Sequence, residues 1–437
     1  MRCRSSCAVV AFALWSVVLP VVDLGAQVDL KARGEIVITG AQVLDPTGEG
    51  FVAGRAVWID RGRIRAVAPL SELAEIAADC ERIDGRGGFV IPGLIDLHSH
   101  LLLRPYDEVS WNDQVLKESL PLRTIRATVA ARATLAAGFT TLRELGTEGA
   151  GYADVALRDA IAEGLIPGPR VFAATRALVA TGCYGPSGFA PEIALPKGAQ
   201  VADGPVALRV ATREQIAAGA DWIKVYADYR RRPGGPSSPT FSLDELRAIV
   251  DEATSAGVPV AAHAVTTEAI RRAVSAGVRT IEHGYHADDA TLEQMREAGV
   301  VLCPTLTASD AIARYNGWDG RGPEPPRVRV ARVMFQRALR SGVTIACGSD
   351  VGVFRHGDNA REIELMAEWG MGPKRALQAA TAVAAAVLGK AAELGQVREG
   401  FRADVVLLRQ DPHRDAKALR TVALVVKDGV VVHRAPD

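Results

Sequence analysis

The chain has 437 residues, of which 48% are hydrophobic and 23% charged, and its formal net charge is zero. This is the composition of an ordinary globular protein, and the length favours one large domain joined to a smaller one. The balanced charge argues against nucleic acid or an acidic membrane surface as a partner.

The first residues are typical of a secretory leader. Arg2 and Arg4 precede an apolar stretch over 8–22, and small residues follow around Ala26. The apolar stretch is shorter than the roughly 20 residues of a membrane-spanning helix. We therefore expect a signal peptide over 1–26, export to the periplasm or the medium, and no membrane attachment after cleavage.

Short β-branched runs at both ends of the chain are typical of strands. They are 35–44 and 56–67 near the start and 403–408 and 422–432 near the end. Turn signals such as Asp45-Pro46 separate them. The pattern predicts one small β domain assembled from both chain ends, with its two parts over 27–91 and 391–437.

The middle of the chain repeats one motif: a helix-like stretch ends in a small residue and glycine, and a short apolar strand follows. The pairs are Ala137-Gly138, Ala256-Gly257, Ala276-Gly277, Ala298-Gly299 and Ser341-Gly342. Glycine suits the residue after a helix because it adopts positive φ without steric cost. With the runs 89–97, 170–175 and 222–226, the total is eight strands.

Eight strands alternating with helices predict an α/β fold, a (β/α)8 barrel over 92–390. The alternative is an open doubly wound sheet, but the sequence has no glycine-rich phosphate-binding turn after the first strand. A barrel places its chemistry at the carboxyl ends of the strands.

Polar residues occur at those strand ends. They are His98 and His100 in the first strand, Lys224 in the fourth, His263 in the fifth, His283 in the sixth and Asp350 after the eighth. A single histidine of this kind is more often a hydrogen-bonded rim residue than a metal ligand. Four histidines at strand ends, with a carboxylate, favour a metal site.

This order of residues resembles the amidohydrolase superfamily, in particular its binuclear branch of imidazolonepropionase-like enzymes and Xaa-Pro dipeptidases. The resemblance extends to Phe-Val-Ile-Pro-Gly-Leu-Ile-Asp before His98 and to the late Gly-x-x-Ala-Asp-Val-Val-Leu-Leu. It implies a metal-bearing barrel with a β-sandwich domain built from both chain ends. The implied ligands are His98, His100 and Asp350 for one ion, His263 and His283 for the second, and a carboxylated, bridging Lys224.

The chemistry of lysine supports that modification. A free ammonium has three donors and no lone pair, so an unmodified Lys224 would repel dications, whereas a carbamate would act as a bridging anion. The alternative is a lysine paired with a rim carboxylate such as Asp228. Histidine and carboxylate ligands suit Zn²⁺, with manganese and cobalt as alternatives.

Two metals ~3.5–4 Å apart can share a hydroxide and polarise a carbonyl. Asp350 could then accept the proton of the hydroxide and pass it to the leaving nitrogen. The expected reaction is hydrolysis of a C–N bond, in an amide or peptide, without an acyl-enzyme intermediate.

Four further residues are candidates for substrate binding. Tyr226 lies two residues beyond Lys224 and could donate a hydrogen bond to an oxyanion or a carboxylate; an amphipathic rim tyrosine is the alternative. Arg230 begins an arginine run that is either a solvated charge cluster or a contact for an anionic substrate end. Tyr184 stands where prolidase-like members read Gly-Gly-His-Gly, and His356 follows the eighth strand.

The expected substrate is a dipeptide, as for Xaa-Pro dipeptidases, or an N-acyl amino acid. One alternative is a one-metal cyclic-amide hydrolase or deaminase, which would not need Lys224 as a bridge. A non-catalytic metal-binding protein on the same barrel is the third hypothesis. The sequence leaves the oligomeric state open, a homo-oligomer included.

Overall fold

The computed structural model describes residues 34–73, 76, 78–232 and 234–436. The leader expected over 1–26 lies outside the described residues. Among the helices in the described part of the chain, none combines the length and apolar character needed to cross a membrane.

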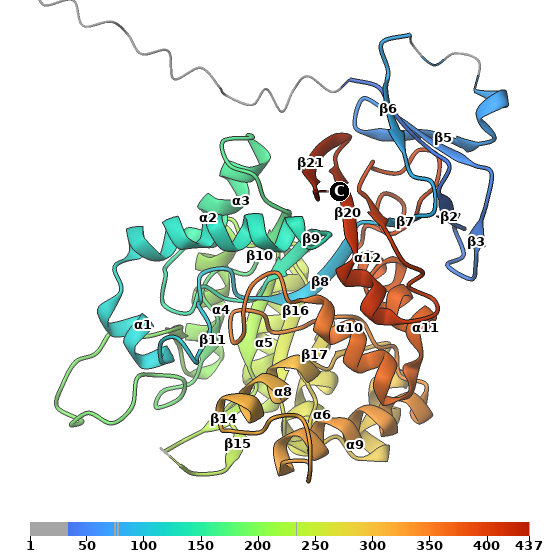
Figure 1. Ribbon diagram of the computed structural model, residues 1–437. Coiled ribbons are helices and arrows are strands. Elements are labelled where there is room, and N and C mark those ends of the chain that lie inside the picture. The colour runs from blue at the N-terminus through green and yellow to red at the C-terminus, as the bar shows by residue number, and fades with distance from the viewer. Residues whose placement is uncertain (1–33, 74–75, 77, 233, 437) are drawn as a thin grey trace, which may run out of the picture.

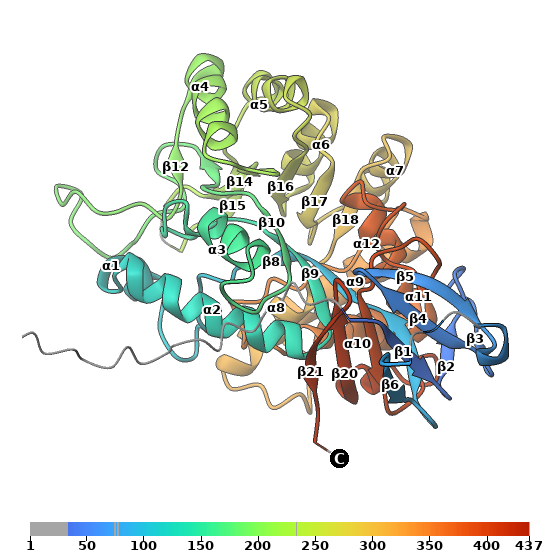
Figure 2. The same cartoon turned by 90° about the horizontal axis from the view of Figure 1, so that it is seen from above.

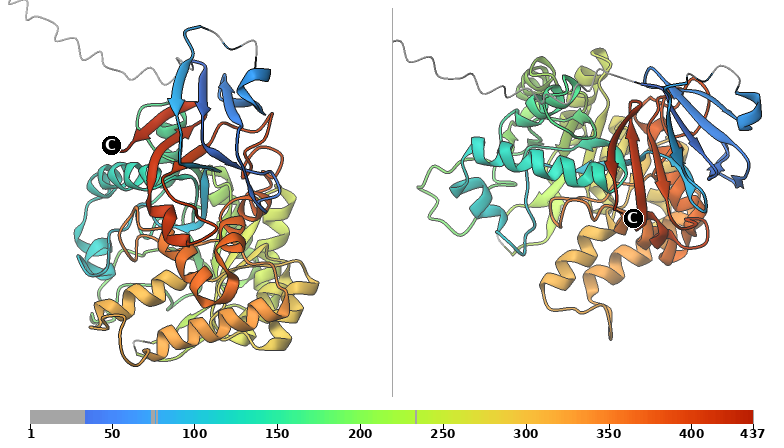
Figure 3. Two further views of the ribbon diagram at one scale, coloured as in Figure 1. Left: turned by 45° about the vertical axis from the view of Figure 1, so that its right-hand side comes forward. Right: turned by 45° about the horizontal axis from the view of Figure 1, so that its top comes forward.

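Two sheets are built from the strands near the chain ends, and the second of them combines strands from both ends (Figure 1). The four-stranded sheet has the order β5 (Arg63–Ala68), β4 (Ala56–Asp60), β1 (Ile36–Thr39) and β6 (Glu81–Asp84). The six-stranded sheet has the order β21 (Val430–Arg434), β20 (Val422–Lys427), β19 (Val405–Leu408), β7 (Phe89–Pro92), β2 (Gln42–Leu44) and β3 (Phe51–Val52). Late and early segments of the chain are therefore hydrogen-bonded neighbours, which Figure 3 shows as red strands beside blue ones.

A shared apolar core holds these two sheets face to face. Ile38 and Ile59 come from the first sheet, and Val90, Val405 and Leu407 from the second. Successive strand residues point to opposite faces, which explains why Ile38 enters this core while Val37 packs on the other side with Cys80.

The central part of the chain is α/β, with parallel strands in two sheets. One has the order β10 (Arg170–Ala173), β9 (Phe139–Glu144) and β8 (Leu94–Ser99). The other has the order β12 (Gln200–Val201), β11 (Leu178–Val179), β13 (Ile223–Tyr226), β16 (Val260–Ala264), β17 (Thr280–His283) and β18 (Val301–Cys303). A short antiparallel hairpin, β14 (Asp228–Arg230) and β15 (Ser237–Pro239), follows β13.

The segment 343–351 connects the two parallel sheets without forming a regular strand. The Leu302 N–H donates to the Thr344 carbonyl on one side, and the Leu97 N–H donates to the Cys347 carbonyl on the other, at 2.9 and 3.0 Å. The eighth strand expected here is irregular because side chains hold part of it: Ser349 bonds the buried carboxylate of Asp96 through both its N–H and its hydroxyl.

Helices follow most of the strands and lie outside the parallel sheets (Figure 2). They are α1 (Trp111–Lys117), α2 (Leu120–Ala136), α3 (Ala153–Ala162), α4 (Gly204–Ala217), α5 (Leu243–Ser255), α6 (Thr267–Ala276), α7 (Asp289–Glu297), α8 (Leu306–Tyr315), α9 (Pro326–Ser341), α10 (Ala360–Met366), α11 (Pro373–Ala379) and α12 (Ala382–Val387). The helix ends agree with the glycine motif, since Gly277 and Gly342 cap α6 and α9 with φ of 94° and 74°.

Helix α6 illustrates how the helices pack against the strands. Ala269, Ile270, Ala273 and Val274 occupy one face and are buried, whereas Arg272 bonds Glu268 in the previous turn. Burial of that apolar face stabilises the helix more than its intrinsic propensity does. Truncation of the fully buried Ile270 to alanine is expected to cost about 2–5 kcal/mol.

Candidate functional site

A cavity of about 580 Å³ opens at the carboxyl ends of the parallel strands. The strand-end residues on its wall are His98, His100, Tyr226, His263, His283 and Asp350. Lys224 is buried beside this wall, with its Nζ atom 5.4 Å from the ring centroid of Tyr226. The structure thus brings together all six residues expected from the sequence to hold metal.

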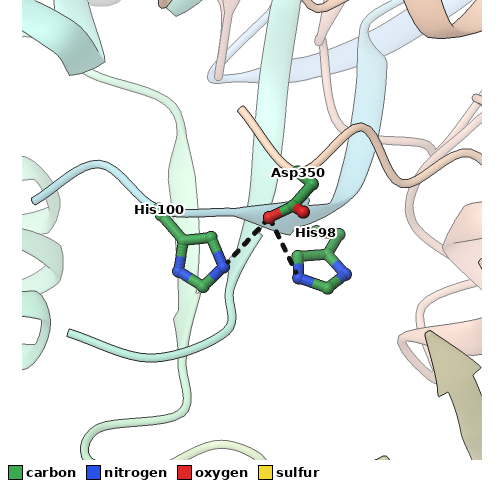
Figure 4. Close-up of side chains that lie close together, drawn as sticks. All are labelled: His98, His100 and Asp350. Carbon is green, nitrogen blue, oxygen red and sulfur yellow. Dashed lines mark ion pairs between the residues drawn. The ribbon is translucent and has the colours of Figure 1, made fainter. Parts of the chain in front are cut away.

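His98, His100 and Asp350 form the tightest group (Figure 4). The Oδ1 atom of Asp350 lies 3.5 Å from Nε2 of His98 and 3.3 Å from Nε2 of His100. One ligand atom from each residue lies within 4.8 Å of the other two, a spacing that suits a shared cation.

The second nitrogen of each of these histidines has a protein partner. Nδ1 of His98 lies 2.9 Å from the carboxylate of Glu282, and Nδ1 of His100 lies 3.0 Å from the carbonyl of Gly146. A carboxylate or carbonyl oxygen can only accept, so each Nδ1 carries a proton, and Nε2 of a neutral ring then has the lone pair that a metal would take. Partners of this kind are usual for metal-ligating histidines.

His263 and His283 continue this group of imidazoles. Their ring centroids are 4.5 Å apart, and the ring of His283 is 5.2 Å from that of His98. Nδ1 of His283 lies 2.7 Å from the Thr305 hydroxyl, and Nε2 of His263 lies 3.5 Å from the Asp228 carboxylate. Each of these two rings therefore has one nitrogen directed at a protein oxygen and a second nitrogen left for another partner.

Lys224 has no carboxylate within ion-pair distance in the described part of the chain. The alternative partner Asp228 instead accepts hydrogen bonds from the backbone of Val265 and Thr266 and from the Thr266 hydroxyl. Burial lowers the pKa of Lys224, although nearby Glu282 and Asp350 oppose the shift. A lysine whose neutral form is favoured in this way has a lone pair that can react with carbon dioxide.

The charge states suit a cation site. Burial lowers the pKa of His98 and of His283 well below the usual value, so both are neutral donors. Burial opposes ionisation of His100, but its hydrogen bond to Asp350 and the nearby Glu148 raise its pKa to about 9. For Asp350, burial is outweighed by His98 and His100, and its pKa is lowered. The neutral imidazoles of His98 and His283 and the ionised carboxylate of Asp350 are donors that divalent ions take readily, whereas His100 must release a proton to bind one.

The backbone around the cavity contains left-handed residues other than glycine. His283 has φ of 73° and Asp350 has φ of 65°. The φ angle is also positive at Glu148, Tyr184 and Thr305. Residues other than glycine rarely adopt such conformations, and those that do are concentrated at functional sites. Here they turn the chain at strand ends, so that His283 reaches the cavity although it follows the inward-facing Glu282.

A buried ion pair supports His98 from behind. Glu282 accepts from Nη2 of Arg143 at 2.8 Å and from the Thr280 hydroxyl at 2.5 Å. Arg143 is fully buried, donates to the Leu97 carbonyl at 2.6 Å and stacks over the ring of Trp222. Removal of either partner of this buried pair would leave the other charge without compensation.

The substrate-binding candidates are placed differently from one another. Tyr226, Tyr184 and Arg230 line the cavity. His356 is not among the lining residues; its Nε2 lies 2.9 Å from the carbonyl of Leu103. The Tyr226 hydroxyl is directed at Oε1 of Glu148, at 3.5 Å, rather than at the metal-site histidines.

Several residues of this site were missing from the sequence prediction. They are Glu148, Tyr229, Tyr285 and Arg327, which line the cavity, and Glu282, which supports His98. Glu148 follows β9 within four residues, so a search for acids after every strand would have found it. Glu282 directly precedes His283, but no local pattern indicates its contact with His98.

Comparisons with known proteins agree with this geometry. Residues 89–432 match the model of the amidohydrolase family. Ochratoxinase of Aspergillus niger is 33% identical over 366 residues, 76% of this chain and 72% of the relative. Imidazolonepropionase of Symbiobacterium thermophilum is 27% identical over 411 residues, 87% of this chain and 90% of the relative. A crystal structure of a Xaa-Pro dipeptidase with methionine in its active site has a TM-score of 0.82 and 30% identity, covering 92% of this chain and 100% of that one.

Proposed function

The chain belongs to the amidohydrolase family, as its motifs predicted, and we propose that it hydrolyses the amide or peptide bond of a small molecule with two divalent ions. It is a hydrolase acting on carbon–nitrogen bonds. The proposal includes closure of the parallel strands into a (β/α)8 barrel through the segment 343–351, supported by the backbone bonds on both of its sides.

In this proposal His98, His100 and Asp350 hold one ion, and His263 and His283 hold the other. Lys224, as its carbamate, would bridge them, and Zn²⁺ is the expected metal. When bound, the two ions would activate water and polarise the scissile carbonyl. The observation that carries the proposal is the convergence of His98, His100 and Asp350 on the wall of the cavity.

The chain's own residues would move the proton. Oδ1 of Asp350 lies within 3.5 Å of both His98 and His100, so this carboxylate is held at the place where a water proton would be released. Asp350 would accept that proton and donate it to the leaving nitrogen. Glu282 and Gly146 would keep the two imidazoles in one tautomer throughout.

The substrate we propose is a dipeptide or an N-acyl amino acid. Support comes from the prolidase-type neighbour and from two arginines, Arg230 and Arg327, on the wall of the cavity. Among the described residues neither arginine has a carboxylate within ion-pair distance, so both guanidinium groups could bind a substrate carboxylate. The proposal also includes a leader over 1–26 and export, for which the basic start and the apolar stretch of the sequence are the support.

Metal analysis with a substrate library tests the proposal. We expect about two divalent ions per chain and hydrolysis of at least one dipeptide or N-acyl amino acid. Chelation should abolish the activity, and added Zn²⁺ should restore it. Two bound ions without hydrolysis of any amide would contradict the proposal.

A one-metal enzyme is the second candidate, because only His98, His100 and Asp350 lie within common ligand distance in the described part of the chain. It predicts one ion per chain and no effect of carbon dioxide on activity. The same metal analysis therefore separates the two candidates.

A further inference from the structure

A row of aromatic rings leads away from the candidate metal site. The ring of Tyr226 stacks on His263 with a centroid distance of 4.6 Å and an interplanar angle of 24°. Tyr184 lies over Tyr226 at 4.2 Å, and both line the cavity. Trp111 lies 5.0 Å from Tyr184 and supports it without being one of the lining residues. We call Trp111, Tyr184 and Tyr226 the aromatic wall.

Glu148 fixes the aromatic wall. Its side chain is 1% exposed and accepts hydrogen bonds from Trp111 Nε1 at 2.8 Å, from the Tyr184 hydroxyl and, at 3.5 Å, from the Tyr226 hydroxyl. Its own backbone is held as well, because its carbonyl accepts from Arg123 at 2.8 Å. One carboxylate thus connects α1, the loop after β11 and the end of β13.

The hydrogen bonds determine which chemistry the aromatic wall offers to a ligand. A phenol has a single proton, and both Tyr184 and Tyr226 direct theirs at Glu148. The ring of Tyr226 is stacked by His263 and Tyr184, so the ring edges of the cavity-lining Tyr184 and Tyr226 are what remains for contact. Other lining residues of the cavity, such as Leu103, Ile312 and Val353, are apolar. Offset and edge-to-face ring contacts are favourable in such a chamber.

We propose that the aromatic wall is a subsite for a ring-bearing apolar group of the substrate, and that Glu148 is the positioning residue that sets this specificity. The inference rests on the proposed function. It narrows the substrate class to amides with an aromatic or cyclic apolar side chain next to the scissile bond. The alternative occupant is a cation, since aromatic faces and a carboxylate also attract ammonium groups. Burial of Glu148 behind three donors favours the apolar ring.

Steady-state kinetics of the metal-loaded enzyme tests the inference with Gly-Phe, Gly-Ala and Gly-Lys and with the reversed dipeptides. In the natural protein we expect KM for the better phenylalanine isomer to be about tenfold below that of its alanine analogue. Glu148→Ala and Tyr184→Ala should remove this difference by raising KM for the phenylalanine substrate more than KM for its alanine analogue. Glu148→Gln, which keeps one acceptor oxygen, should restore part of it.

Ligand binding provides a readout besides activity. L-phenylalanine, but not L-alanine, should change the tryptophan fluorescence, and Trp111→Phe should remove the change. Glu293→Gln, a surface carboxylate paired with Arg296, is the matched control and should behave like the natural protein. If Glu148→Ala fails to fold, Tyr184→Phe carries the test, since it keeps the ring and loses only the bond to Glu148.

The outcomes separate this inference from the proposed function. Absence of all hydrolysis with an intact phenylalanine fluorescence response would remove the proposed reaction and leave the subsite. Equal KM values for phenylalanine and alanine substrates would overturn the subsite and leave the reaction. A preference for Gly-Lys that Glu148→Gln abolishes would show that the carboxylate binds a cation and would also overturn it.

Discussion

Nδ1 of His98 lies 2.9 Å from Oε2 of Glu282, and both side chains are buried. The contact joins β8 to β17 and leaves Nε2 of His98 directed at Asp350. The charge of Glu282 is balanced by Arg143, which pairs with the other carboxylate oxygen, Oε1. The geometry of one candidate metal ligand therefore depends on a carboxylate that does not itself face the cation.

We expect Glu282→Gln to weaken metal binding by about 10–100-fold, the usual cost of losing such a partner. The amide can present an N–H to Nδ1 of His98 and so favour the wrong tautomer. Competition with a chelator, followed by metal analysis, measures the affinity. Glu268→Gln, on the exposed side of α6, is the control. An unchanged affinity would mean that Glu282 serves packing alone.

Asp350→Asn tests the proton carrier. An amide oxygen can still contact a cation but cannot accept a proton at neutral pH, so we expect metal to be retained and kcat to fall by about 10²–10⁴-fold. Metal content and single-turnover rates should be measured on the same preparation. Full turnover with full metal content would remove Asp350 from the proton transfer.

Lys224→Ala tests the proposed bridge. Without a carbamate the two cations would face each other unscreened, and we expect metal occupancy and activity to fall together. A short carboxylate such as acetate should restore part of both, since it can supply the missing anion. In the protein with the natural sequence, removal of bicarbonate during metal loading should slow the recovery of activity. A variant that binds two ions without added carboxylate would contradict the bridging role.

Much of this arrangement was predictable from local sequence patterns. Apolar runs indicated β8, β16 and β17, and the residues that end them, such as His100 and His263, lie at one cavity as expected. The periodicity of the strands and the glycine after each helix are local signals, and parallel strands bring their carboxyl ends to one edge. That combination was enough to assemble the candidate metal site.

The rest depends on contacts that no local pattern contains. His98 and Glu282 are 184 residues apart in the sequence, and their contact requires β8 and β17 to face each other across the interior. The left-handed turn at His283 reverses the side that simple alternation would assign to it. The position of Tyr184 is set by Glu148 and Tyr226, which belong to other segments.

Glu362 provides a pH-dependent measure of stability away from the metal ligands. Its carboxylate accepts from the N–H groups of Leu306 and Thr307 and from the Thr307 hydroxyl, but burial dominates and raises its pKa from 4.5 to about 8. The native state therefore binds this proton more tightly than the unfolded state does. Its contribution to stability is complete below about pH 4.5 and is lost as the pH rises to about 8.

We accordingly expect the apparent Tm of the natural protein to fall between pH 5 and pH 8. The apparent Tm of Glu362→Gln should fall less steeply over the same range. Scanning calorimetry at fixed ionic strength and scan rate measures both slopes. Asp154, whose pKa is raised by burial to about 6, contributes in the same direction, so part of the slope should remain in the variant. Identical slopes in the two proteins would show that Glu362 ionises alike in the folded and unfolded states.

The arginines of the cavity wall predict a preference for a free carboxylate on the substrate. Arg230 comes from β14 and Arg327 from the first turn of α9, so the two guanidinium groups reach the cavity from separate elements. Because both are exposed, each contact should be modest, and Arg327→Ala should raise KM by about two- to fivefold. The effect should be absent for substrates whose carboxyl group is amidated and should shrink as salt is added. Arg340→Ala, at the far end of α9, is the matched control. If Arg327→Ala raises KM equally for acid and amide substrates, Arg327 contributes to the shape of the cavity rather than to its charge.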